Sequence, residues 1–169
     1  GLKTRDQAKT FIYALVYGAG DAKIGKIING DINKGKALKE RFFKNLPALK
    51  KLKDRVQQAS NRGFLKGIDG RKIHVRSQHS ALNTLLQGCG AIVMKQAMIN
   101  LYELIKLNTV DAQFVANIHD EWQLQVKESQ ADYIGRLGVE SIEKVTEQFN
   151  MRCDLTGQYK IGGNWSETH

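Results

Sequence analysis

The sequence of 169 residues predicts an α+β fold, in which a helical first part precedes hairpins grouped around one long helix. Apolar residues recur with helical spacing through the first 60 residues, interrupted by glycine turns and by the only proline. Two later stretches have the composition of β-hairpins, and an apolar run far longer than an ordinary helix lies between them.

Four helices are expected in the first part, at residues 4–18, 20–28, 33–45 and 47–60. The breaks between them fall at Gly18-Ala19-Gly20, at Asn29-Gly30-Asp31 and at Pro47.

The second part is expected to begin with a hairpin, because residues 64–68 and 72–76 flank Asp69-Gly70, a strong two-residue turn signal. A buried helix follows at about residues 80–107. A hairpin at 114–126, a helix at about 129–149 and a strand near 151–162 complete the predicted elements.

Charge is unevenly divided along the chain. Residues 1–76 carry 19 Lys and Arg against 6 Asp and Glu, whereas residues 77–169 carry 7 against 11, so the net charge of +9 combines +13 with −4. A basic first half favours contact with phosphate polymers or an anionic membrane, and an acidic second half suits solvation or metal capture. The lysine run from Lys34 to Lys53 is interpreted as a solvated helix face.

Length and cysteine content exclude several classes of protein. The chain suits one ordinary domain with its own core. Cys89 and Cys153 are too few for a disulfide framework or a structural zinc site, and both are expected to be reduced, buried thiols. No apolar stretch approaches the roughly 18 residues of a membrane span and no signal-peptide pattern opens the chain, so a cytosolic protein is expected.

A stripe of two cations and two aromatic rings runs along the first predicted helix. Arg5, Lys9, Tyr13 and Tyr17 recur every fourth residue and therefore share one slowly drifting face. The cations lie in the first turns, where free backbone N–H groups and the helix dipole also favour anions. This pattern predicts a grip for a nucleoside triphosphate.

Adjacent carboxylates occupy the turn of the later hairpin. In His119-Asp120-Glu121 the two acids repel each other, and such a pair is useful where divalent cations are held against phosphate oxygens.

Together these segments resemble motif B and motif C of the family A DNA polymerases, which include bacterial DNA polymerase I and the replicative polymerases of short-tailed phages. Residues 5–13, followed by Tyr17-Gly18-Ala19-Gly20, are similar to the fingers helix, and Ile118-His119-Asp120-Glu121 to the palm hairpin. Further segments similar to the family are residues 67–72, 81–88 and 164–169. The resemblance covers essentially the whole chain.

The resemblance implies a fingers-like helical part at residues 1–62, with the motif B helix at about 4–18. Residues 63–169 are implied to be the C-terminal palm part, with the motif C hairpin at about 114–126, part of an antiparallel palm sheet and the long central helix. The implied reaction is nucleotidyl transfer from a deoxynucleoside triphosphate (dNTP) to a primer 3′-hydroxyl by a two-metal mechanism.

The resemblance also implies roles for single residues. The nucleotide-binding residues are Arg5, Lys9 and Tyr13, and Lys9 is in addition a proton donor to pyrophosphate. The implied template and primer contacts are Tyr17, Gly18, Asn83, Gln87 and His119. Asp120 is the implied metal ligand, and Glu121 is a second candidate for the two Mg²⁺ ions.

The family's motif A, a strand carrying the partner aspartate and the residue that excludes ribose, lies upstream of the fingers helix and is absent from this sequence. The thumb and any exonuclease domain are absent too. The chain is therefore expected to be the C-terminal piece of a split or truncated polymerase. Its expected partners are an N-terminal polymerase fragment, primer-template DNA and a dNTP, in the cytoplasm of a bacterium or a phage-infected host.

Several alternatives stay open. The first helix also fits a surface helix that buries Tyr13 and Tyr17, and Asn83 and Gln87 also fit hydrogen bonding within a helix. The whole chain also fits a non-catalytic nucleic-acid-binding module, half of a single-subunit RNA polymerase, or a protein-interaction remnant. Glu121 favours DNA over RNA synthesis, because the RNA enzymes usually carry Ser at that position.

Overall fold

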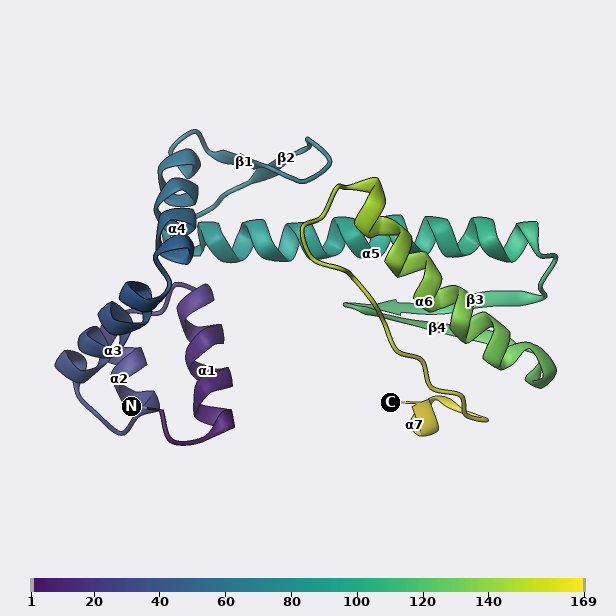
Figure 1. Cartoon of the computed structure of the whole chain (residues 1–169), viewed down its shortest axis with the longest axis horizontal. Helices are drawn as coiled ribbons and strands as arrows, with labels where there is room; N and C mark the ends of the chain where they lie inside the picture. The colour runs from purple at the N-terminus through teal and green to yellow at the C-terminus, as the bar shows by residue number, and fades with distance from the viewer. Residues whose placement is uncertain (1, 169) are drawn as a thin grey trace. The chain divides into compact units, whose positions relative to one another are not determined.

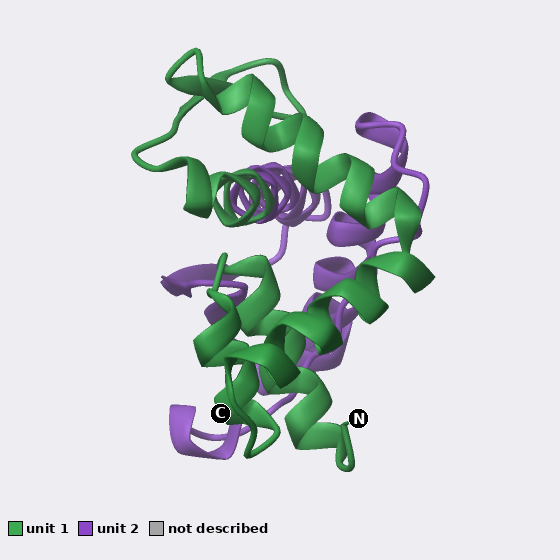
Figure 2. Ribbon diagram, turned by 90° about the vertical axis from the view of Figure 1, so that its left-hand side faces the viewer, with its two compact units in different colours: residues 1–88 green, residues 89–169 purple. Residues whose placement is uncertain are grey.

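The computed structural model describes residues 2–168, so that His169, the last residue of the family-like terminal segment, lies outside the described part (Figure 1). The chain forms two compact units, unit 1 at residues 1–88 and unit 2 at residues 89–169 (Figure 2). Helix α5, Ala81–Leu107, begins in unit 1 and continues into unit 2. Within residues 2–168, no helix combines the length and the apolarity that crossing a membrane requires.

Unit 1 contains the four predicted helices, with ends within a few residues of those expected. They are α1 Arg5–Val16, α2 Asp21–Ile27, α3 Ile32–Asn45 and α4 Pro47–Ser60. Side chains cap two of them: the Thr4 hydroxyl accepts from the Gln7 N–H at 3.2 Å, and Asp31 accepts from the Lys34 N–H at 2.9 Å. Pro47 occupies the first turn of α4, where its missing N–H costs no helical hydrogen bond.

The first core of unit 1 lies among α1, α2 and α3. Phe11 and Ile24 are completely buried, and Ala14 and Leu15 lie beside them. The Phe11 ring meets the edge of Phe42 at 5.1 Å between centroids. Full burial of each large apolar side chain contributes about 1.5–3 kcal/mol, so this face fixes which side of α1 turns inward.

The predicted hairpin at Asp69-Gly70 is present, with a longer loop than the turn signal indicates. Strands β1 Phe64–Lys66 and β2 Lys72–His74 pair antiparallel, and Lys66 lies opposite Lys72. Residues 67–71 therefore form a five-residue loop, closed by the Gly67 N–H donating to the Arg71 carbonyl at 2.8 Å. A second core beneath it consists of Val56, Leu65, Val75, Ala81 and Leu82.

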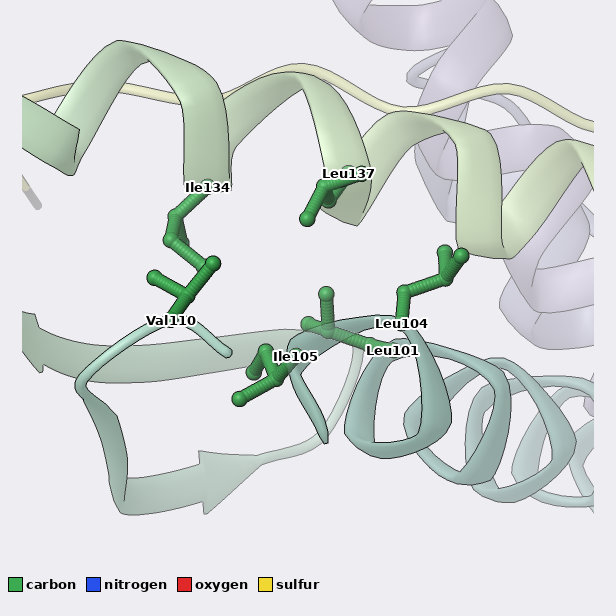
Figure 3. Packing of buried hydrophobic residues seen from close by; sticks show 6 residues of the cluster. All are labelled: Leu101, Leu104, Ile105, Val110, Ile134 and Leu137. Carbon is green, nitrogen blue, oxygen red and sulfur yellow. The ribbon is translucent and has the colours of Figure 1, made fainter. Parts of the chain in front are cut away.

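Unit 2 packs a two-stranded sheet and one long helix against the second half of α5. The sheet consists of β3 Ala112–Ile118 and β4 Glu121–Val126, and the helix is α6 Ala131–Gln148. Their shared core consists of Leu101, Leu104, Ile105, Val110, Ile134 and Leu137, which point toward one another in Figure 3. Apolar side chains of both strands cover this core, among them Phe114 and Trp122.

The strand predicted near residues 151–162 is wrong, because this segment has no sheet partner and lies along α6 instead. The Leu155 N–H donates to the Thr146 hydroxyl at 2.9 Å, and the Tyr159 hydroxyl donates to Asp132 at 2.6 Å. The hydrogen bond to this carboxylate raises the pKa of Tyr159 above its ordinary value. The segment ends in the short helix α7, Trp165–Thr168.

The expectation of two buried thiols holds only in part. Both cysteines are free, but Cys153 is exposed, because it lies in the C-terminal segment outside the core, and Cys89 is half-buried on α5.

Candidate functional site

The stripe on α1 is a free face of the helix. Arg5 and Lys9 are exposed, and the residues Tyr13 and Tyr17 are 51% and 53% exposed. The two rings stack at 6.3 Å between centroids with 17° between their planes. The alternative that buries both tyrosines is therefore wrong, because Phe11, Ala14 and Leu15 take the inward face.

A tight turn ends α1 directly after Tyr17. Gly18 has φ +76°, and the Ala19 N–H donates to the Ala14 carbonyl at 2.8 Å, which is the hydrogen bond of a Schellman cap. A Cβ on Gly18 would lie 2.2 Å from the carbonyl oxygen of His79. This close approach fixes the end of the stripe against the 3₁₀ helix Gln78–Ser80, which directly precedes α5.

Asn83 and Gln87 lie in the first turns of α5, and they differ in environment. Gln87 is exposed, whereas Asn83 is half-buried and its Oδ1 atom is buried without a hydrogen-bond donor among residues 2–168. A buried acceptor without a donor costs about 1–3 kcal/mol. Such an atom suits a site that a ligand or a water completes.

The β3–β4 hairpin presents the acidic residues at its tip. Ile118 pairs with Glu121, so that His119 and Asp120 form a two-residue loop. His119 has φ +54°, and both loop residues are exposed. The two carboxylates differ in exposure: Asp120, in the loop, is exposed, whereas Glu121, the first residue of β4, is half-buried.

Gln123 is a residue that the sequence analysis did not single out. Its Nε2 donates a hydrogen bond to Oε1 of Glu121, two positions earlier on β4. Thr168 of α7 in turn donates to Oε1 of Gln123 at 3.4 Å. The sequence could have indicated this pair, because residues i and i+2 of a predicted strand project to the same face of the sheet.

The acidic tip fits Mg²⁺ in the type of its ligands. Carboxylate oxygens are the ligands that Mg²⁺ prefers, and Asp120 and Glu121 supply them. Between residues 2 and 168, no group of three or more His, Cys, Asp or Glu residues gathers closely enough to hold a metal ion.

The predicted site residues fall into two groups. The stripe, Gly18, Asn83 and Gln87 belong to unit 1, and His119, Asp120 and Glu121 belong to unit 2. In the first group, the end of the stripe at Gly18 lies against His79, two positions before α5, and in the second group the three residues are consecutive. The prediction that the two groups share one nucleotide-sized space stays a prediction.

Comparisons with known proteins all lead to one family. The model of DNA polymerase family A matches residues 2–167. The DNA-directed DNA polymerase of Escherichia phage Phieco32 is 42% identical over 100% of this chain and 29% of its own length. That of Enterobacteria phage T3 is 40% identical over 99% of this chain and 27% of its own. The chain thus spans less than a third of either relative.

Among the solved structures that resemble the fold is the POL domain of Pol1 from M. smegmatis in complex with DNA primer-template and dNTP. It superposes with a TM-score of 0.75 at 22% identity and covers 83% of this chain and 27% of its own.

Proposed function

The chain belongs to the family A DNA polymerases, and we propose that it forms the C-terminal fingers and palm part of a template-directed DNA polymerase. The observation that carries the proposal is the match of the family model to residues 2–167. It is supported by the free cationic and aromatic face of α1 and by the exposed carboxylate at the tip of the β3–β4 hairpin.

In the proposed reaction the primer 3′-hydroxyl loses its proton to water and its oxygen bonds to the α-phosphorus of a dNTP, as the bond from that phosphorus to pyrophosphate breaks. Arg5 binds the outer phosphates through the planar fork of its guanidinium. Lys9, one turn later, adds a point charge and donates a proton to the leaving pyrophosphate. Stabilising the charge that develops on the leaving group is the main task of these two cations.

Tyr13 stacks near the incoming sugar and base, and Tyr17 closes on the templating position. Gly18 supports this role because its tight turn ends the helix directly after the Tyr17 ring. Asn83, Gln87 and His119 contact the primer terminus and the minor groove, where the hydrogen-bond acceptors are common to all correct base pairs. The buried, unpaired Oδ1 of Asn83 supports a partner supplied from outside the described chain.

Asp120 would hold Mg²⁺ in this proposal, and Glu121, whose carboxylate accepts a hydrogen bond from Gln123, would be the second carboxylate. Bound Mg²⁺ supplies Lewis-acid stabilisation of the attacking and leaving oxygens. A partner aspartate and the thumb come, in this proposal, from an upstream segment. The length of the relatives supports that part, because the chain spans only 29% of the Phieco32 polymerase.

The test is a chimera in which this chain replaces the matching segment of the Phieco32 phage polymerase. The chimera is expected to extend a primer with dNTPs and magnesium, and Asp120→Asn is expected to abolish extension with little loss of DNA affinity. Asp111→Asn is the matched control, because Asp111 lies at the other end of the same hairpin, in an exposed ion pair with Lys127 at 3.5 Å.

A folded chimera that binds primer-template DNA without extending it contradicts the proposal, and so does an active Asp120→Asn variant. Extension with ribonucleotides in place of dNTPs assigns the chain to RNA synthesis instead. Extension by the 169-residue chain alone contradicts the need for an upstream segment. The proposed site of action is the cytoplasm of a bacterium or an infected host.

A further inference from the structure

Positive charge is dense on two consecutive helices. Helices α3 and α4, within residues 32–60, carry nine Lys and Arg against two Asp and Glu, a net charge of +7 beside +9 for the whole chain. This charge lies on a part of the molecule to which the proposed transfer reaction assigns no role.

Part of this charge faces a shared groove. A groove of about 580 Å³ lies between α3 and α4, entirely within unit 1, and five lysines line it: Lys36, Lys39, Lys44, Lys50 and Lys53. They are spaced three to five residues apart along each helix, so each set follows one face at intervals of about 4.5–7.5 Å. The acidic lining residues are Asp21, Glu40 and Asp54.

The lysines that line the groove outnumber its carboxylates by five to three, so that the lining keeps a net positive charge. Lys39 forms an ion pair with Asp21 at 3.0 Å. Lys36, Lys44 and Lys50 form no ion pair with any of residues 2–168. Unneutralised cations along a concave surface raise the local concentration of anions.

An aromatic ring lies in the same groove. Phe43 is half-buried, and the Nζ of Lys53 lies 5.8 Å from its ring centroid. An aromatic platform among cations is the arrangement by which proteins hold single-stranded nucleic acid, because bases stack on the ring while the phosphates follow the cations. An acidic polypeptide would use the lysines without using the ring.

We propose that the α3–α4 groove binds the sugar-phosphate backbone of one nucleic-acid strand, at a site separate from the nucleotide and metal residues. The groove favours one strand over a duplex, because bases can stack on the Phe43 ring only when they are not held in a base-paired double helix. Binding at this site needs neither a dNTP nor a metal ion.

The experiment compares two double variants of the 169-residue chain with equal charge change. Lys36→Glu/Lys50→Glu reverses two groove lysines, whereas Lys34→Glu/Lys51→Glu reverses two exposed lysines on the same helices that do not line the groove. Affinity for a labelled twelve-nucleotide oligo(dT) is measured by fluorescence anisotropy in EDTA and without dNTP.

The groove variant is expected to bind at least tenfold more weakly than wild type, and the control variant within about threefold. The slope of log affinity against log salt should flatten by about 1.4 in the groove variant alone, about 0.7 for each phosphate that no longer has a lysine beside it. Phe43→Leu, which keeps an apolar side chain, should weaken oligo(dT) binding while leaving binding of polyglutamate unchanged.

Three results overturn the inference: an equal loss in both double variants, equal affinity for duplex and single strand, or equally strong competition by polyglutamate. Thermal unfolding monitored by circular dichroism verifies that each variant is folded. Should a glutamate variant unfold, the Lys→Gln pairs at the same positions repeat the comparison. Failure of this inference leaves the transfer reaction intact, because the Asp120→Asn chimera tests that separately.

Discussion

The carbonyl oxygen of His79 fills the space beside Gly18 so closely that a Cβ on this glycine would lie 2.2 Å from it. The contact joins the end of α1, where the exposed Tyr17 lies, to the 3₁₀ helix Gln78–Ser80 directly before α5. The turn at Gly18 has φ +76°, a conformation that residues other than glycine rarely adopt. Two independent constraints therefore act on one residue.

Gly18→Ala is expected to destabilise the protein by about 1–3 kcal/mol, from the positive φ together with displacement of the His79 backbone. Gly20→Ala is the matched control, because Gly20 has φ −70° and no atom within 4 Å of the position of a Cβ. Urea denaturation measures both. Equal stabilities for the two variants would show that the contact has no energetic weight.

Gly135→Ala is expected to loosen the C-terminal segment from α6. A Cβ at this position would lie 2.2 Å from Cδ2 of Tyr159, whose hydroxyl is held by Asp132. Gly138→Ala on the same helix meets no atom and should instead stabilise it by about 1 kcal/mol through helix propensity. Limited proteolysis after residue 150 reports the loosening, and the prediction is wrong if both variants resist protease equally.

Asn100→Leu is expected to destabilise unit 2 by about 1–3 kcal/mol, because it removes a buried amide from the interface of two helices. Nδ2 of Asn100 donates to the Ser141 carbonyl at 3.0 Å and to Gln148 at 3.0 Å. Gln148→Ala should cost less, since Gln148 is exposed and Asn100 keeps its bonds to Ser141 and Gln96. Equal losses in denaturant titrations would argue against the buried amide as the main cause.

Cys89 should react slowly with alkylating reagents. Burial raises the pKa of its thiol, and the nearby Cys153 thiol adds repulsion between negative charges. Since the folded pKa exceeds the unfolded one, the protonated thiol contributes stability below the unfolded pKa, and this contribution is lost as pH rises through the folded pKa.

The measurement is the rate of iodoacetamide alkylation against pH in a Cys153→Ser variant, which leaves Cys89 as its only thiol. The midpoint should lie higher in the folded protein than in urea. Coincident midpoints would contradict the shift.

Local sequence patterns determined the elements of this protein. Apolar spacing with Gly and Pro punctuation predicted α1 to α6 within a few residues, because capping and helical periodicity act over one or two turns. The hairpins around Asp69-Gly70 and Asp120 followed for the same reason, although the first has a five-residue loop in place of the predicted two-residue turn. The family was recognisable from contiguous motifs.

Tertiary structure decided what each face of those elements meets. The stripe from Arg5 to Tyr17 was readable as a pattern, but only packing of Phe11 against Ile24 and Phe42 turned it outward. Residues 151–162 had the composition of a strand, yet Tyr159 and Leu155 found partners on α6. The contacts between Gly18 and His79, 61 positions apart, arise from chain reversals that no local pattern encodes, because their energy appears only when distant segments are packed together.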